Sequence, residues 1–184
     1  MCIRDRNNDE LVATFGNLVN RVLSMIHRNF DGQVPSQNNV GTSEVEINKL
    51  AEATLISVSE SIELCKFREG LTHCMSLARE VNRYLDEKAP WTAIKSDRDS
   101  AGTTLNNSVN IINCLKTLLH PYLPFSTQAL HEMLGLEGGV EKNGWTWKSQ
   151  ELTPGHKLGE VKRLFDKLDD SVAEEELSRL GSES

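Results

Sequence analysis

Apolar residues recur at intervals of three and four along four long segments of this chain, and that spacing constrains the fold more than any other feature. The interval places the apolar side chains on one face of an α-helix. The predicted long helices are 7–30, 43–65, 67–89 and 103–120, followed by a short helix at 126–134. Because each helix has one apolar face to bury, the sequence predicts an all-α fold, an antiparallel helical bundle.

Capping residues and prolines indicate where the helices begin and end. Asn7 with Glu10, and Ser43 with Glu46, have the three-residue spacing of a capping box, so they predict the starts of the first and second helices. Pro90 predicts the end of the third helix, because the residue before a proline is disfavoured in helical conformation.

The same patterns divide the chain into three parts. The first, 1–6 (MCIRDR), does not extend the helical pattern and is interpreted as a foreign or artefactual N-terminus. Residues 7–135 form the helical bundle. Residues 136–184 form an irregular C-terminal appendage, in which 144–148 alternates like an edge strand and 172–180 is an acidic helix.

Composition and motifs exclude several classes of protein. The net charge of −7 argues against blanket phosphate neutralisation and a DNA partner, but 166–183 alone holds seven acids and two bases, so the rest of the chain is nearly neutral. A nucleic acid would have to be read by a few placed side chains. Scattered cysteines and the absence of a membrane span or signal peptide predict a cytoplasmic location. The sequence has no phosphate loop, GxSxG or HExxH motif, so no metal, cofactor or catalytic group is expected in this fragment.

Two features indicate where binding occurs. One is a polar stripe along the first helix, formed by Thr14, Asn17, Arg21, Ser24 and Arg28. Such a stripe is usually a solvated face, but an amide and a guanidinium one turn apart can address the edge of one unpaired base. The other is Trp91, which is either a core residue or a platform for a stacked base. If the first and third helices are neighbours, Asn17, Arg21 and Trp91 flank one pocket.

Two strings, GNLVNR at 16–21 and LAREVNRYLDEKAPW at 77–91, resemble the anticodon-binding domain of bacterial methionyl-tRNA synthetases, and the similarity covers nearly all of 7–169. The resemblance implies that Asn17 and Arg21 contact the cytosine that opens the CAU anticodon. It also implies that Trp91 stacks on an anticodon base and that Pro90 lines the same site. Asp86 is implied to discriminate against other tRNAs.

The resemblance further implies the anticodon loop of tRNA(Met) and the synthetase's own catalytic domain as partners. In that family ATP and magnesium are used by the catalytic domain, whose signatures are missing here, so the fragment alone is predicted to be inactive. One departure is Lys162-Arg163, where the family pattern has a proline. The alternative interpretation is an acidic helical protein-interaction module derived from such a domain.

Overall fold

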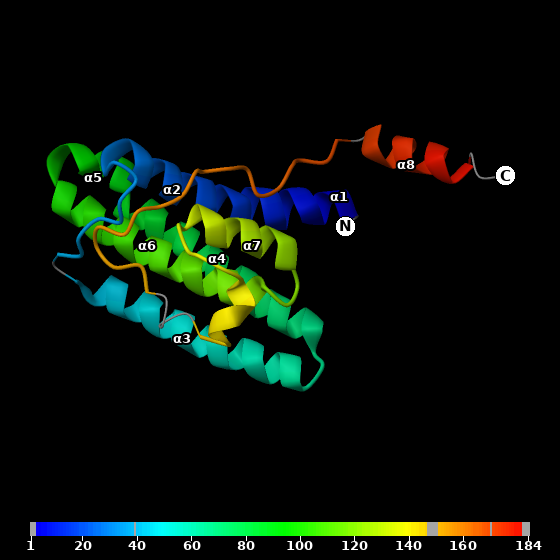
Figure 1. The fold of residues 1–184 in the computed structure, drawn as a ribbon, viewed down its shortest axis with the longest axis horizontal. Coiled ribbons are helices and arrows are strands. Elements are labelled where there is room, and N and C mark those ends of the chain that lie inside the picture. The colour runs from blue at the N-terminus through cyan, green and yellow to red at the C-terminus, as the bar shows by residue number, and fades with distance from the viewer. Residues whose placement is uncertain (1–2, 39, 147–150, 170, 182–184) are drawn as a thin grey trace.

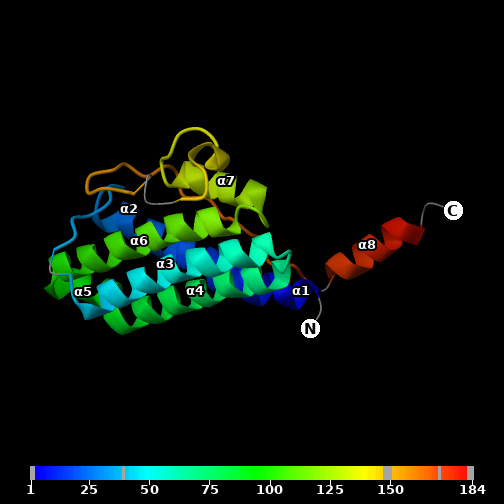
Figure 2. The ribbon, with the colours of Figure 1, turned by 90° about the horizontal axis from the view of Figure 1, so that it is seen from below.

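The fold is built from long helices that lie side by side (Figures 1 and 2). The computed structural model describes residues 3–38, 40–146, 151–169 and 171–181. Within these residues the regular structure is helical, and extended pairing is limited to an isolated bridge between Gln33 and Lys157. The prediction of an all-α helical bundle is therefore confirmed.

The N-terminal helix is a continuous rod of three segments: α1 (Ile3–Arg6), the π-helix η1 (Asn7–Gly16) and α2 (Asn17–Asn29). The prediction that this helix begins at Asn7 is wrong, because the chain is already helical from Ile3. The Asn7 side chain does not cap the helix and contacts the C-terminal tail instead. The foreign origin of residues 1–6 stays a prediction.

The C-terminal tail runs back along this rod and is held by two asparagines. Asn7 Nδ2 donates to the carbonyl of Asp166 at 3.0 Å. Asn8 makes a reciprocal pair with the Leu168 backbone, in which its Nδ2 donates to the carbonyl at 2.9 Å and its Oδ1 accepts from the amide at 2.9 Å. The side-chain amide thus satisfies both backbone groups of Leu168, as a neighbouring strand would. Phe165 packs near Phe15, with ring centroids 6.1 Å apart.

The second and third helices form a hairpin of α3 (Thr42–Glu63) and α4 (Phe67–Lys88). Helix α3 begins at Thr42, so the predicted Ser43 and Glu46 cap is wrong. Glu44 instead folds back, and its Oε2 accepts a hydrogen bond from the Gly41 amide at 2.9 Å. The turn between the helices passes through Cys65, which has a positive φ and an exposed side chain.

A buried carboxylate fixes the end of α4 to the start of α3. Glu44 Oε1 accepts hydrogen bonds from the Tyr84 hydroxyl at 2.8 Å and from Lys88 Nζ at 2.9 Å. Burial opposes ionisation of Glu44, but the hydrogen bonds from Lys88 and Tyr84 outweigh it and lower the pKa of this carboxyl. The charged network therefore holds in place the last turn of α4, which carries Asp86.

Beyond α4 the chain forms two helices where the sequence predicts one. A short helix, α5 (Pro90–Ser96), precedes the long α6 (Arg98–Leu119). The predicted start of the fourth helix at Thr103 is wrong, because Asp97 caps α6 by accepting a hydrogen bond from the Ser100 amide at 3.0 Å. Proline 90 does end α4, but it also occupies the first position of α5, where a proline costs no hydrogen bond.

Helix α6 is the centre of the bundle, and all of its residues from 101 to 119 are buried. Helices α2, α3, α4, α5 and α7 all pack against it. A helix enclosed on every side pairs most of its polar side chains with other protein groups. Asn106 Nδ2 donates to the Pro35 carbonyl at 2.8 Å, and Asn110 Oδ1 accepts from the Leu152 amide at 2.9 Å. These side chains tie two irregular segments to the core.

A buried lysine lies near the other end of α6. Lys116 Nζ donates to Asn113 Oδ1 at 2.8 Å and lies 3.2 Å from His131 Nδ1 on α7. Burial lowers the pKa of Lys116 to about 8 and also lowers the pKa of His131. These groups join α6 to α7 through polar contacts within the core.

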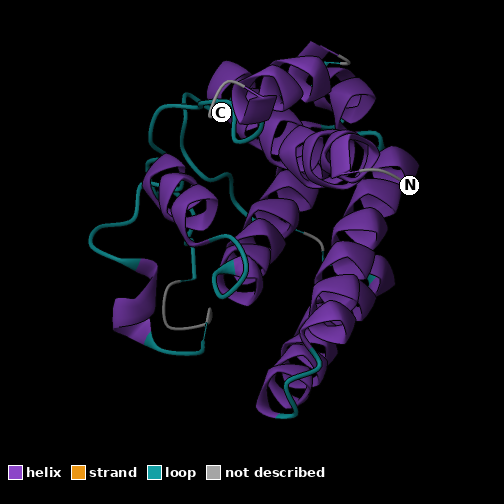
Figure 3. Ribbon diagram, turned by 90° about the vertical axis from the view of Figure 1, so that its right-hand side faces the viewer, coloured by secondary structure: helices purple, strands orange, loops and turns teal. Residues whose placement is uncertain are grey.

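The remaining elements are α7 (Pro124–Met133), the 3-10 turn η2 (Val140–Asn143) and α8 (Ser171–Gly181). The predicted acidic C-terminal helix is confirmed as α8, which extends away from the bundle (Figures 1 and 2). Figure 3, coloured by secondary structure, shows helices and loops and no strand among the described residues. The predicted edge strand is not present at Gly144–Thr146, and its remainder, Trp147 and Lys148, lies outside the described residues.

Candidate nucleic-acid interface

The polar face of α2 supplies the first part of the candidate site. The opposite face is fully engaged in the core through Leu18, Val19, Val22, Leu23 and Ile26. This burial fixes the rotation of the helix, so that Asn17 is exposed and Arg21, one turn later, is partly buried. The two side chains therefore stand on one ridge, as predicted from their spacing.

The corner between α4 and α5 supplies the second part. Ala89 takes a left-handed conformation, with φ 42° and ψ 56°, which ends α4 and turns the chain into α5. Pro90 follows, is buried and starts α5, which leaves the side chain of Trp91 on the surface with 42% of the residue exposed. A residue other than glycine in this conformation is strained by about 1–3 kcal/mol, so the surrounding packing must hold the corner in place.

Arg21, Asp86 and Trp91 meet where α2 passes the end of α4. Arg21 Nη2 donates to Asp86 Oδ1 at 2.8 Å, and the guanidinium carbon lies 5.0 Å from the centroid of the Trp91 ring. The Asp86 side chain is 63% exposed, so this ion pair contributes only about 0.2–1 kcal/mol to stability. Its main effect is to hold the planar guanidinium against the indole.

The structure therefore brings together four of the five predicted site residues. Arg21 contacts both Asp86 and Trp91, and Pro90 directly precedes Trp91 in the chain. Asn17 is one helical turn from Arg21, and its side-chain amide makes no hydrogen bond with the described part of the chain. The first and third predicted helices are neighbours through η1, α2 and α4. Whether these residues bind RNA stays a prediction.

The chemistry of the cluster suits an unpaired base. The half-exposed indole offers a face on which a base can stack, and the guanidinium offers planar donors beside it. The free amide of Asn17 adds a donor and an acceptor on the same ridge. These side chains can stack on the flat face of a base and form hydrogen bonds with its edge, which is how proteins recognise single-stranded RNA.

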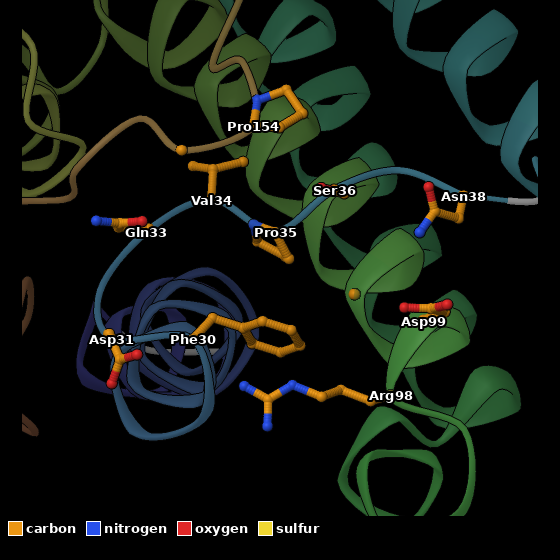
Figure 4. Close-up of a pocket in the computed structure, with 12 residues that line it drawn as sticks. Phe30, Asp31, Gln33, Val34, Pro35, Ser36, Asn38, Arg98, Asp99 and Pro154 are labelled. Carbon is orange, nitrogen blue, oxygen red and sulfur yellow. The ribbon is translucent and has the colours of Figure 1, made fainter.

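One part of this end of the molecule was missed by sequence reasoning. A cleft of about 520 Å³ is lined by Phe30, after α2, and by Arg98, at the start of α6 (Figure 4). The two residues are far apart in the sequence, and the start of α6 was placed too late. The signal that identifies this start is Asp97 with Ser100, a capping residue and the amide that it accepts from.

Other kinds of site are not visible in the described residues. No group of three or more His, Cys, Asp or Glu there is arranged to hold a metal ion. No helix among those residues is both long and apolar enough to span a membrane.

Comparison with known families gives a match over most of the chain. The model described as the anticodon binding domain of methionyl tRNA ligase matches residues 34–184. That range includes Asp86, Pro90 and Trp91, whereas Asn17 and Arg21 precede it.

Curated relatives cover those earlier residues as well. A methionine–tRNA ligase of Chloroflexus aggregans is 40% identical, with 96% of this chain and 33% of the relative aligned. One from Dehalococcoides mccartyi is 42% identical, with 96% of this chain and 32% of the relative aligned. The chain therefore spans about a third of the length of these relatives.

Solved structures show the same fold. Methionyl-tRNA synthetase of Mycobacterium tuberculosis in its free state aligns with a TM-score of 0.84 at 24% identity, over 91% of this chain and 34% of that one. The same enzyme in complex with methionyl-adenylate aligns with a TM-score of 0.80 at 25% identity, over 87% of this chain and 32% of that one.

Proposed function

Because this chain belongs to the family of anticodon-binding domains of methionyl-tRNA ligases, we propose that it reads the CAU anticodon of methionine tRNA. The observation that carries the proposal is the contact between Arg21, Asp86 and Trp91, with Arg21 Nη2 2.8 Å from Asp86 and its guanidinium 5.0 Å from the Trp91 ring. The three side chains come from α2, the end of α4 and the start of α5, and they converge on one exposed surface. A helix face that is only solvated has no need of such a convergence.

In the proposed mode, the cytosine that opens the anticodon leaves the base stack and lies against Trp91. Stacking on an aromatic side chain contributes roughly 1–3 kcal/mol whatever the base. Identity is then read at the Watson–Crick edge, where cytosine has two acceptors and an amino donor. Arg21 supplies donors and Asn17 supplies both a donor and an acceptor, whereas uracil presents a donor at its ring nitrogen that a guanidinium cannot satisfy.

Asp86 and Pro90 position the side chains that would contact the base. Asp86 orients the guanidinium of Arg21 and offsets its charge, so that a phosphate is less attractive to Arg21 than a base edge. Pro90 is buried and fixes the approach of α5, so the indole is held before RNA arrives. A platform that is already ordered loses little conformational entropy on binding.

We further propose that the anticodon domain acts with a catalytic domain that attaches methionine to tRNA(Met) in the cytoplasm, using ATP and magnesium. The aligned relatives are named methionine–tRNA ligases, which supports the attachment of methionine to tRNA. The present chain, which aligns to about a third of them, would contribute the tRNA contact and not the chemistry.

The test is to titrate wild type, Asn17→Ala and Arg21→Ala with anticodon stem-loops whose first anticodon base is cytosine or uracil. Wild type should prefer cytosine by about 5- to 150-fold, the discrimination of one well-placed contact, and each variant should reduce that ratio. Arg28→Ala is the matched control, because it removes an exposed charge from the same helix without touching Trp91. It should change affinity for both loops by the same factor.

Equal binding of both loops by wild type would contradict the proposal and favour the protein-interaction module. A proportional loss for both loops in the Asn17 and Arg21 variants would show that these residues do not read the base.

A further inference from the structure

A buried polar network on the α3 side of α4 lies next to the proposed cytosine site. Its centre is Glu44, in the first turn of α3, which is only 2% exposed. Lys88, whose ammonium lies 2.9 Å from this carboxylate, is the last residue of α4, and Trp91 follows it by three residues. A short stretch of chain therefore joins the buried carboxylate to the exposed indole.

The carboxylate of Glu44 joins three parts of the chain. Its Oε2 accepts a hydrogen bond from the Gly41 amide, ahead of α3, at 2.9 Å. Its Oε1 accepts from the Tyr84 hydroxyl at 2.8 Å and from Lys88 Nζ at 2.9 Å. Burial and the adjacent carboxylate raise the pKa of Tyr84, so the phenol keeps its proton and can donate. The contacts define one position for the Lys88 side chain, with its ammonium 5.8 Å from the centroid of the Tyr84 ring.

The last turn of α4 is held on two opposite sides. Tyr84 and Lys88 are four residues apart, so they share the side of the helix that faces α3. Asp86, midway between them in the sequence, lies on the other side and pairs with Arg21 of α2 at 2.8 Å. A shift of this turn would move the carboxylate that orients the Arg21 guanidinium, and the contact of Lys88 with Glu44 opposes such a shift.

The backbone transmits the position of Lys88 to α5. Ala89 follows directly, in a left-handed conformation that is strained for a residue other than glycine. Its carbonyl accepts hydrogen bonds from the amides of Thr92 at 2.9 Å and Ala93 at 3.1 Å, and these bonds begin α5. Trp91 lies within this first turn. A displaced Lys88 would therefore displace the corner and the indole with it.

The chemistry of the network indicates a role other than stability. Two charged groups lose hydration when they are buried, and their mutual attraction often does no more than offset that loss. Apolar side chains of similar size commonly stabilise a core as well or better. An ion pair adds a defined arrangement, because its hydrogen bonds are directional. Here the arrangement that it defines is the corner of the proposed RNA site.

We propose that Glu44 is a positioning residue for anticodon recognition, and that it acts through Lys88 to fix the corner that carries Trp91. The same contact sets the last turn of α4, and with it the orientation of the pair formed by Asp86 and Arg21. This inference rests on the proposed function, because discrimination of cytosine is the property that the network supports. Glu44 itself is buried and acts on the RNA only through other side chains.

The experiment measures how strongly each variant prefers cytosine to uracil as the first base of an anticodon stem-loop. Glu44→Gln and Lys88→Met should each reduce the ratio of the two dissociation constants by about 2- to 30-fold, the range for residues coupled to a site through intervening contacts. Lys88→Arg keeps a cation that can reach the carboxylate, so it should retain most of the preference. Because a ratio is compared, any general change in attraction to phosphate cancels.

The double variant Glu44→Gln/Lys88→Met separates positioning from stability. Lys88→Met alone leaves a buried carboxylate without its cation and should lower the urea midpoint of unfolding. The double variant buries no charge in this network and should recover most of that midpoint. Its cytosine preference should nevertheless stay reduced, because no ion pair defines the corner. Recovery of the midpoint and the preference together would show that the network only stabilises the fold, and would overturn the inference.

The indole can also be followed without RNA. The chain has three tryptophans, so labelling with 5-fluorotryptophan gives three fluorine resonances, and Trp91→Phe identifies the one that belongs to Trp91. This resonance should shift or broaden in Glu44→Gln and in Lys88→Met, and should keep its wild-type position in Lys88→Arg. An unchanged Trp91 resonance in Glu44→Gln would overturn the inference.

Lys66→Met is the matched control. It also removes a lysine paired with a glutamate, but at the other end of α4, where Lys66 Nζ lies 3.6 Å from Glu69 Oε2. The variant should change neither the cytosine preference nor the Trp91 resonance. A change in the preference as large as that in Lys88→Met would show that loss of any such lysine has this effect, and the inference would be wrong.

The outcomes distinguish this inference from the proposed function. If wild type prefers cytosine and both Glu44→Gln and Lys88→Met keep that preference, the inference is wrong while the proposed function stands. If Glu44→Gln binds both loops more tightly at an unchanged ratio, Lys88 is a phosphate contact that Glu44 restrains, and the inference is again wrong. If wild type binds both loops equally, both fail.

Discussion

Replacing Trp91 with alanine separates the two roles that a tryptophan at a helix end can have, core packing and base stacking. The structure leaves 42% of Trp91 exposed, so a little over half of the residue is buried. A tryptophan buries roughly 150–250 Å² when enclosed, and half of that, at about 25 cal/mol per Å², gives an upper bound of about 2–3 kcal/mol. Because the unfolded chain is itself partly compact, the expected loss of unfolding free energy is about 1–2 kcal/mol.

The same variant is also expected to lose free energy of RNA binding. A stacked base contributes about 1–3 kcal/mol, so the variant should bind an anticodon stem-loop about 5- to 150-fold more weakly. Binding is measured by fluorescence anisotropy of a labelled stem-loop, which does not depend on tryptophan emission. Stability is measured by urea unfolding followed by circular dichroism.

Trp145 provides a matched control on another surface. It is 37% exposed, close to the value for Trp91, and lies in the appendage. Trp145→Ala should reduce stability by a similar amount without changing RNA affinity. Equal weakening of RNA binding by both variants would refute a specific stacking role for Trp91. A stability loss of about 3–5 kcal/mol in Trp91→Ala would show that the indole is mainly a packing residue.

Three further predictions follow from the same structure. Asp86→Asn should change the unfolding free energy by less than about 1 kcal/mol, because the carboxylate is 63% exposed; it should also lower the preference for cytosine and steepen the salt dependence of binding, and an unchanged salt slope would contradict the proposed charge offset. Burial lowers the pKa of Lys116 from 10.5 to about 8, so unfolding takes up a proton between these values and the contribution of the lysine to stability rises with pH there, by at most about 1.4 kcal/mol per pH unit. The stability of wild type relative to Lys116→Met, measured by urea unfolding, should therefore increase from pH 8 to pH 10, and a difference that does not change with pH would contradict the lowered pKa of Lys116. The chain alone should form no methionyl-adenylate in an ATP–pyrophosphate exchange assay, since its sequence contains no phosphate-binding loop; detectable exchange would refute this.

The existence of the long helices was predictable, whereas their ends were not. Periodic apolar residues predict a helix because many residues along one face follow the same spacing. A helix end depends on one or two side chains that have several competing partners. Asn7 has the spacing of a cap but binds the tail, and Asp97, the true cap of α6, was overlooked. The sequence predicts a helix end at Pro90 but no helix start there, although proline also favours the first position of a helix.

The site was predictable in its residue types but not in its contacts. Spacing alone places Asn17 and Arg21 on one ridge, and the resemblance points to Trp91, Pro90 and Asp86. The ion pair between Arg21 and Asp86 depends on how α2 packs against α4, which periodicity does not determine. The cleft beside Phe30 depends further on the left-handed corner at Ala89 and on the unpredicted α5, because these set where α6 begins.

The reciprocal pair between Asn8 and Leu168 has a consequence for the order of folding. The two residues are 160 positions apart, so closing this contact from an unfolded chain carries nearly the largest loop entropy that the molecule can impose. It is expected to form only after the bundle has brought its ends together, and so to be among the last contacts made and the first to open. In native-state hydrogen exchange, the Leu168 amide should therefore exchange through local opening, faster than the amides of α6, which require global unfolding.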